Sequence, residues 1–351
     1  MENTATATPS SADDLLDLDP VFPEHETGRR RALDYLGHAP CPLRAELRRR
    51  FHAHCRAMNP APQWYMAGGC HGDDIYDGLW QTTDAGELPG LISDTGFGDF
   101  NRPEFARRWL ADDKTFARIG AGGENDAAGG GEIRLEFHEA GLIDPQGFYR
   151  VYGANVEIIL VDLNRLGDRP APRAWADVLH PRFRRDIIVS GDPQGIHESI
   201  LFGLYRDHGE AALAALGANV RDFMHPAEMA KTAGSANPRG AALYLLPGFF
   251  SASCPHRERT RVVWPGEGAY LTPQYILRRR DARPAADFFA GYLCGAEWAA
   301  HLAKIGFAPA RAGSPPLPGR LRWVGWDFVR DHDIEALGAT LNAAFARGHS
   351  A

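Results

Sequence analysis

The apolar positions of the chain gather in two long extended segments that lack a helical repeat. Val262–Pro273 runs from a β-branched pair through a Pro-Gly turn, and Val151–Leu163 is aliphatic along its length and ends before a Pro-rich turn. A helix repeats its apolar residues every three or four positions, and neither segment does so. The two segments therefore predict strands that cross between two lobes, with a ligand cleft that closes by hinge motion.

On both sides of these crossovers, short apolar strands lead into glycine-rich turns and then into helices. Strands are predicted over residues 64–67, 88–93, 186–189 and 241–246, and helices over 73–79, 196–204, 211–216, 285–293 and 297–305. The repeated order of strand, turn and helix is typical of parallel sheets. We therefore predict an α/β fold with two lobes, in which two parallel-rich sheets are joined by two extended hinge crossovers.

The first 58 residues follow a different pattern. Residues 1–24 are polar and acidic, which predicts disorder, whereas residues 27–58 carry apolar residues at helical spacing. The helical evidence is the short piece Arg30–Leu36 and the stripe of Leu43, Leu47, Phe51 and Cys55. We expect an extra N-terminal helical segment. The predicted organisation is residues 1–58 as a disordered lead plus helical extension, 59–155 and 264–351 as lobe 1, and 156–263 as lobe 2.

Composition and charge narrow the class of protein. The net charge is −7, and no block of like charges is long enough to act as a nucleic-acid arm, so we expect no nucleic-acid partner. No apolar run reaches the roughly 18 residues of a membrane-spanning helix. The N-terminus lacks the basic start and apolar core of a secretion signal, which favours the cytoplasm, with the periplasm as the alternative. Five widely spaced cysteines do not suggest a disulfide framework.

Candidate ligand contacts follow from the position of the predicted turns. In parallel α/β lobes, ligands lie beyond the carboxyl ends of the strands, where the turns open into helices. Glycines let the backbone approach a ligand there, and the amides at a helix start attract anions. Asp94, Thr95 or Asp192 can equally serve as helix caps. The candidate ligand-binding residues in four such turns are Gly69, Cys70, His71, Asp94, Thr95, Asp192, Gln194, His197, Glu198 and Ser251.

Two cysteine–histidine pairs raise the question of a bound metal ion. Cys70 and His71 lie in a turn of the first lobe, and Cys254 and His256 lie in a turn of the second. If the pairs face each other across the cleft, they supply the four nitrogen and sulfur ligands that tetrahedral zinc prefers. Core or surface positions for these residues are the alternative. A metal ion is therefore the one cofactor that the sequence suggests, and no other is indicated.

No catalytic signature stands out in the sequence. It contains no Gly-x-Ser-x-Gly elbow, no phosphate-binding Walker loop and no paired metal-binding histidines at helical spacing. We therefore expect a binding protein and not an enzyme. The alternative is an enzyme that reuses the same fold, with Cys70, His71, Asp192 or His197 in acid–base or nucleophilic roles.

Three segments resemble a known superfamily. Residues 170–181 resemble the pattern P-x-x-W-x-D-L-x-x-P, Ile187–Gly191 is similar to the strand and turn after it, and residues 295–298 with 306–309 resemble its C-terminal motif. On these residues the chain is similar to the substrate-binding proteins of ABC transporters, with the type II periplasmic-binding-protein fold of the iron-type branch. The similarity spans roughly Asn59 to Asn342. The adjacent Tyr-Tyr pair that usually marks ferric-iron binders is absent.

The resemblance and the predicted cleft together imply a solute-binding protein. The expected ligand is small and polar, anionic or metal-containing, and closure of the lobes would capture it. The implied partner is an ABC permease or, for intracellular carriage or sensing, an intracellular protein. A third hypothesis is a metal-delivery protein that docks its partner through residues 1–58.

Overall fold

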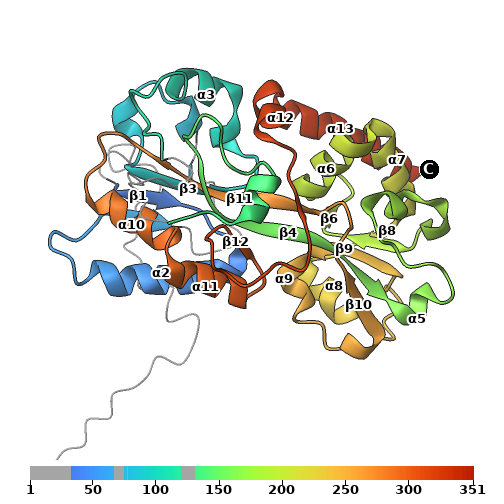
Figure 1. The fold of residues 1–351 in the computed structure, drawn as a ribbon. Helices are drawn as coiled ribbons and strands as arrows, with labels where there is room; N and C mark the ends of the chain where they lie inside the picture. Colours follow the sequence, from blue (N-terminus) through green and yellow to red (C-terminus); the bar gives the residue numbers. More distant parts are fainter. Residues whose placement is uncertain (1–32, 67–74, 77, 120–130) are drawn as a thin grey trace, which may run out of the picture.

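Two α/β lobes lie side by side, and one long strand, β4, pairs in both of them (Figure 1). The structure, a computed structural model, describes residues 33–66, 75, 76, 78–119 and 131–351. The predicted helix over residues 73–79 and the predicted ligand residues Gly69, Cys70 and His71 fall wholly or partly outside these residues.

The first lobe is built on a mixed sheet. Its strands follow the order β2-β1-β3-β11-β4, with β1 parallel to β2 and β3, and β11 antiparallel to β3 and β4. Two short strands pair at its edges, β12 with β4 and β13 with β11. The bounds are β1 Tyr35–Gly37, β2 Trp64–Met66, β3 Leu91–Thr95, β4 Arg150–Asp162, β11 Ala269–Arg278, β12 Ala308–Pro309 and β13 Leu321–Arg322. Its helices are α2 Cys41–Cys55, α3 Pro103–Trp109, α4 Leu135–Glu139, α10 Ala285–Leu293, α11 Ala296–Lys304 and α12 Trp326–Asp331.

The second lobe continues the sheet beyond β4. Its strand order is β4-β9-β5-β8, with β5 parallel to β9 and β8 and with β10 antiparallel to β4. The bounds are β5 Ile187–Val189, β8 Val220–Phe223, β9 Leu243–Pro247 and β10 Thr260–Val263, with a hairpin of β6 Gly191–Asp192 and β7 Gly195–Ile196. Its helices are α5 Leu163–Leu166, α6 Glu198–His208, α7 Glu210–Asn219, α8 Pro226–Thr232, α9 Gly248–Ser251 and α13 Ile334–Ser350.

Both predicted crossovers are confirmed. All 13 residues of β4 are buried; Arg150 to Val156 pair with β11 in the first lobe, and Glu157 to Val161 pair with β9 in the second. The change of partner between Val156 and Glu157 marks the boundary between the lobes. The return path is β10, a Pro-Gly turn and β11. Because β4 belongs to both lobes, the two sheets are continuous in hydrogen bonding and can bend at one shared strand.

The structure confirms the helix predicted from the apolar stripe, as α2, but contradicts the short helical piece predicted before it. Tyr35–Gly37 is not helical but forms β1, which lies between β2 and β3 within the sheet. The stripe on α2 packs onto the lobe, and the rings of Phe51 and Phe289 on α10 lie 4.9 Å apart. Residues 35–55 are therefore a strand–helix unit of the first lobe. A strand of three residues is too short to show a period, which explains the error.

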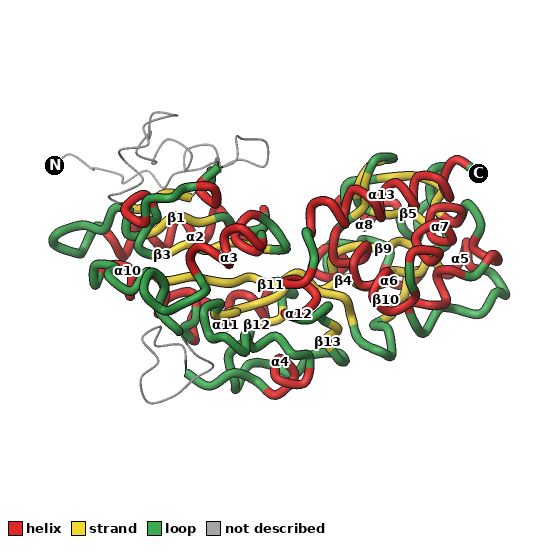
Figure 2. The backbone as a smooth tube through the Cα atoms, turned by 90° about the horizontal axis from the view of Figure 1, so that it is seen from above, coloured by secondary structure: helices red, strands yellow, loops and turns green. Residues whose placement is uncertain are grey.

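The predicted assignment of residues 264–351 to lobe 1 also needs correction. The last helix, α13, packs against α7 of the second lobe, where Arg347 Nη2 lies 2.9 Å from Glu210 Oε1 (Figure 2). Trp326 on α12, by contrast, stacks on Tyr149 of the first lobe at 4.9 Å. The segment between α12 and α13 is thus a third connection between the lobes. No helix was predicted over Ile334–Ser350, and the lobe that such a helix covers is decided by tertiary contacts.

Candidate ligand-binding site

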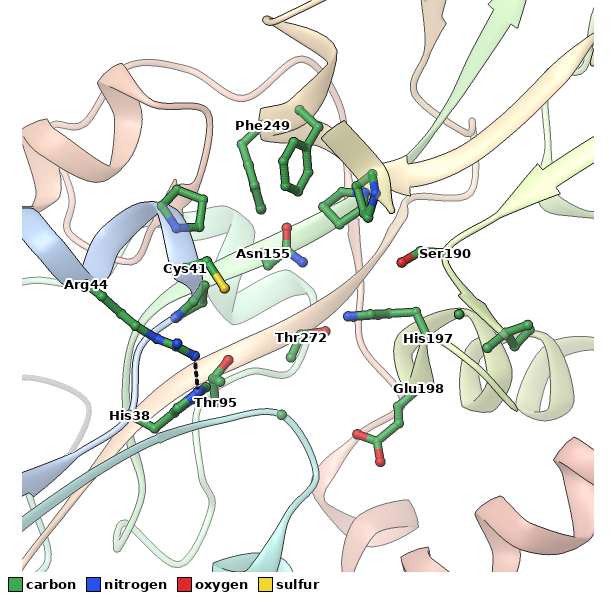
Figure 3. Close-up of a pocket in the computed structure, with 18 of the residues that line it drawn as sticks. His38, Cys41, Arg44, Thr95, Asn155, Ser190, His197, Glu198, Phe249 and Thr272 are labelled. Atoms are coloured by element: carbon green, nitrogen blue, oxygen red, sulfur yellow. Dashed lines mark hydrogen bonds between the residues drawn. The ribbon is translucent and has the colours of Figure 1, made fainter. Parts of the chain in front are cut away.

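A cavity of about 510 Å³ lies at the junction of the two lobes (Figure 3). The first lobe lines it with the turn from β1 into α2 and with the end of β3. The second lobe contributes the segment between β5 and α6 and the starts of α8 and α9, while the crossovers contribute Asn155 and Thr272. All these turns follow the carboxyl ends of strands, as expected for ligand sites in α/β lobes. The volume is typical of a pocket for a small molecule.

Asn155 and Thr272 are paired directly across the two crossover strands. Asn155 is 7% exposed and Thr272 is 8% exposed. Within the described part of the chain, neither Oδ1 of Asn155 nor Oγ1 of Thr272 has a hydrogen-bond partner, and the same holds for Oγ1 of Thr95. Leaving a buried polar group unsatisfied costs about 1–3 kcal/mol. A polar ligand in this part of the cavity could therefore satisfy these atoms with hydrogen bonds.

His197 forms the second-lobe wall at the start of α6. Its Nδ1 lies 3.2 Å from Oε1 of Glu157 and 2.9 Å from Oγ of Ser199. Figure 3 shows the ring directed toward Asn155 and Thr272, so its other nitrogen is the one available to a ligand. Glu157 is fully buried beneath it; burial raises the pKa of this carboxyl, while His197 and Ser199 oppose the shift.

Glu198 adds a carboxylate to the same wall. It lines the cavity, and a Cβ atom added at Gly96 of the first lobe would lie 3.8 Å from its Oε2. The surrounding protein displaces water and so raises the pKa of the Glu198 carboxyl, whereas interaction with His197 acts to lower this pKa. The short distance from the Gly96 position shows that the Glu198 carboxylate lies close to the first lobe.

The first-lobe wall carries a buried arginine. The Nε of Arg44 donates to the carbonyl of Ala39 at 2.6 Å, and its Nη2 lies 2.6 Å from Nε2 of His38. Both Arg44 and His38 line the cavity. A guanidinium stays protonated at any physiological pH, so this wall carries a permanent positive charge.

Three of the predicted ligand residues, Thr95, His197 and Glu198, line the cavity. Asp94 is buried beside it and accepts a hydrogen bond from Tyr275 at 3.3 Å, and Ser251 Oγ donates to the carbonyl of Gly248 at 2.7 Å. The exposed Asp192 accepts from the backbone of Gln194 at 2.7 Å within the β6–β7 hairpin. None of these four described residues is among those that line the cavity.

The predicted metal site lacks support from the second lobe. Cys254 is buried with Sγ 3.6 Å from Oγ1 of Thr260, and neither Cys254 nor His256, both described residues, lines the cavity. Among the residues that the structure describes, no group of three or more histidine, cysteine or acidic side chains is placed to hold a metal ion. The Cys70 and His71 half of the prediction lies outside those residues.

Sequence reasoning missed much of the cavity wall. His38, Cys41 and Arg44 follow a strand and open a helix, so the rule that selected the other turns selects them once β1 is recognised. Asn155 and Thr272 lie within the two predicted crossovers. A polar side chain in an otherwise apolar buried strand is itself a signal of function, and it was available in the sequence.

Two α/β lobes, a crossover strand that belongs to both and a polar cavity between them define a two-lobed solute-binding protein of the type II periplasmic-binding-protein fold. Residues 86–332 match the family described as bacterial extracellular solute-binding protein, and the chain belongs to this family. No curated protein matches the sequence.

Several solved structures share the fold. Ferric iron-binding protein A of Mannheimia haemolytica, in an open conformation, has a TM-score of 0.61 at 11% identity, covering 90% of this chain and 98% of that one. Iron-bound HitA of Pseudomonas aeruginosa has a TM-score of 0.58 at 14% identity, covering 90% and 99%. The spermidine/putrescine ABC transporter substrate-binding protein PotD of Streptococcus pneumoniae has a TM-score of 0.56 at 12% identity, covering 89% and 98%.

These comparisons confirm the predicted fold and its likeness to iron-binding proteins at the level of architecture. The family and these three structures are of solute-binding proteins and not of enzymes. Over the described residues, no helix combines the length and the apolar character needed to cross a membrane.

Proposed function

We propose that the chain captures a small polar solute between its lobes and presents it to an ABC permease. The observation that carries this proposal is the interlobe cavity, where buried polar atoms of the two crossover strands have no hydrogen-bond partner among the described residues. A solute that bridges the walls would favour the arrangement in which both lobes contact it, by its differential affinity for that arrangement.

The place of action is part of the same proposal. The family is described as extracellular, which supports the periplasm over the cytoplasm predicted from the N-terminal residues. An ABC permease is therefore the partner that we propose. An intracellular partner remains a hypothesis without support from the family.

The enzymatic alternative gains no support from the best catalytic candidate. Glu157 and Ser199 both approach the same nitrogen, Nδ1 of His197. In a hydrolytic triad the acid contacts one ring nitrogen and the nucleophile contacts the other. His197 is therefore arranged as a wall residue supported from below, and Asp192 lies away from the cavity.

The test combines a solute screen with a matched pair of variants. Solutes that raise the melting temperature are titrated by calorimetry; a ligand at 100 times its Kd should stabilise the protein by about 2.7 kcal/mol. Thr272→Val removes the unpaired hydroxyl and should lower affinity about tenfold, while leaving the unliganded protein equally stable or more stable.

The control is Thr260→Val, since this hydroxyl contacts Cys254 and the carbonyl of His256 outside the cavity. It should leave solute affinity unchanged. Equal affinity in Thr272→Val and the wild-type protein would place the binding site elsewhere and contradict the proposal.

A further inference from the structure

The charges around the cavity differ between the layer that lines it and the layer beneath. Arg44, His38 and His197 line the cavity, and Glu198 is the carboxylate in the lining among the described residues. The second nearby carboxylate, Glu157, is fully buried beneath the wall and contacts His197. The surface that meets a ligand thus carries the guanidinium of Arg44, two imidazole rings and one carboxylate.

Two helices add partial positive charge to this surface. α2 has 15 residues and opens at Cys41, and α6 has 11 residues and opens at Glu198, and both of these first residues line the cavity. The first turn of a helix carries partial positive charge on its unpaired N–H groups. These two N-termini come from opposite lobes, and α6 contributes more, because at the start of α2 Pro42 has no N–H and Leu43 donates its N–H to the carbonyl of Pro40.

The second, independent observation concerns hydrogen bonding at the floor. Oδ1 of Asn155 can only accept a hydrogen bond, and its own Nδ2 lies 3.5 Å from Oε1 of Glu157, which orients the amide with its oxygen free to face the cavity. Oγ1 of Thr272 can donate or accept. A fully deprotonated inorganic anion such as sulfate offers no donor to Asn155 or to Glu198, whereas a hydroxyl or amino group does.

We infer that the ligand is a small organic acid that also carries hydroxyl or amino groups. Its acidic group lies between Arg44 of the first lobe and His197 of the second, and its donor groups meet Asn155 and Glu198. This inference rests on the proposed function and adds the ligand class. It also gives closure a physical cause, because one acidic group can contact both Arg44 and His197 only when the two lobes are close together.

The experiment uses the full chain and solutes in matched sets, measured by thermal shift and then by calorimetry. Lactate, propylene glycol and isopropanolamine share a carbon skeleton and differ in charge; glycerol phosphate is paired with glycerol, malate with succinate, and putrescine represents cations without an acid group. We expect acids with hydroxyl or amino groups to bind more tightly than their uncharged or cationic counterparts, and malate more tightly than succinate.

The variants locate the acidic group. Arg44→Gln should weaken binding of the acid by about 10- to 100-fold, as expected for loss of a charge-assisted contact. Arg48→Gln is the matched control, because Arg48 lies one turn further along α2, is equally buried and does not line the cavity. It should leave affinity within about twofold. His197→Gln repeats the test from the second lobe, in case Arg44→Gln disturbs the turn at Ala39.

The outcomes separate the inference from the proposed function. Binding of a cationic or uncharged solute at Thr272, with acids inactive, would overturn the ligand class and retain solute capture. Acid binding that survives both Arg44→Gln and His197→Gln would also overturn the inference. If no acid in the sets binds, the inference fails, and the wider solute screen with Thr272→Val then decides the proposed function separately.

Discussion

At the scale of single residues, the cavity wall is supported by a carboxylate that no solvent reaches. Burial raises the pKa of Glu157 above its ordinary value of 4.5. A carboxyl with a raised pKa in the folded protein binds its proton more tightly there than in the unfolded chain. Its favourable contribution is therefore present at low pH and is lost as the pH rises from 4.5 through the raised pKa.

Glu157→Gln should remove this pH dependence. Glutamine keeps the shape of the side chain and cannot ionise. The free energy of unfolding of the variant, relative to that of the wild-type protein, should therefore increase by about 1 kcal/mol as the pH rises from about 5 to about 7. Urea denaturation at the two pH values measures the difference. Glu104→Gln, in an exposed ion pair on α3, serves as the control with no such trend. A constant offset for Glu157→Gln would show that the carboxyl titrates normally.

Prediction of single site residues succeeded where a turn carried a recognisable cluster of polar side chains. His197 and Glu198 were found because a polar cluster precedes the apolar start of α6. Asp192 was selected with them, but it lies five positions before His197 on an exposed hairpin, whereas His197 and Glu198 line the cavity. Such differences depend on the path of the backbone after the strand, which side-chain types do not determine.

At the scale of elements, the contact between α7 and α13 depends on glycine. A Cβ atom added at Gly217 on α7 would lie 2.2 Å from the carbonyl oxygen of Phe345, which is backbone of α13 and cannot move aside alone. Gly338 on α13 differs, because an added Cβ would lie 3.5 Å from the ring of Phe202, an ordinary contact. The two glycines therefore make a matched pair.

We predict opposite effects for alanine at these two positions. Gly217→Ala should destabilise the protein by about 1–3 kcal/mol, because the helices must separate. Gly338→Ala should be neutral or stabilise by up to about 1 kcal/mol, because alanine favours a helix. Chemical denaturation of both variants checks this. Equal changes in the two would mean that the helices do not pack as closely as the structure shows.

Among the short strands, β2 and β5 were predicted, but β1 and β8 were not. The helix predicted over residues 285–293 matches α10, and the two crossovers match β4 and the β10–β11 path, because each carries a full pattern of apolar positions. β1 has three residues and β8 only four, of which one is buried. Tertiary pairing decides the state of such short segments, and no local pattern reports it.

At the scale of the whole molecule, the lobes also meet through an aromatic contact. Phe97, in the turn after β3, lies 5.0 Å from the ring of Phe202 on α6 and stacks on Trp323 at 5.3 Å. Trp323 lies just before α12, the helix that leads into the third connection between the lobes. The buried apolar cluster is continuous from one lobe to the other through these rings. Lobe movement must therefore pivot about this contact or break it.

Shortening Phe97 should loosen the arrangement of the lobes. We expect Phe97→Leu to increase the radius of gyration of the unliganded protein in small-angle X-ray scattering and to weaken solute binding, since the solute must then supply more of the closure free energy. Phe105→Leu, in the first-lobe core between Phe100 and Phe116, should reduce stability without either change. Identical scattering for Phe97→Leu and the wild-type protein would rule out a role of this contact in lobe movement.

The third connection leaves the two ends of the described chain on different lobes. β1 lies in the first lobe and α13 in the second (Figures 1 and 2). A donor fluorophore at Arg56, in the exposed turn after α2, and an acceptor fused behind Ala351 would therefore travel with opposite lobes. Solute uptake would then register as a change in energy transfer within a single polypeptide, which makes this chain a template for an optical sensor that needs neither a labelled solute nor a second protein.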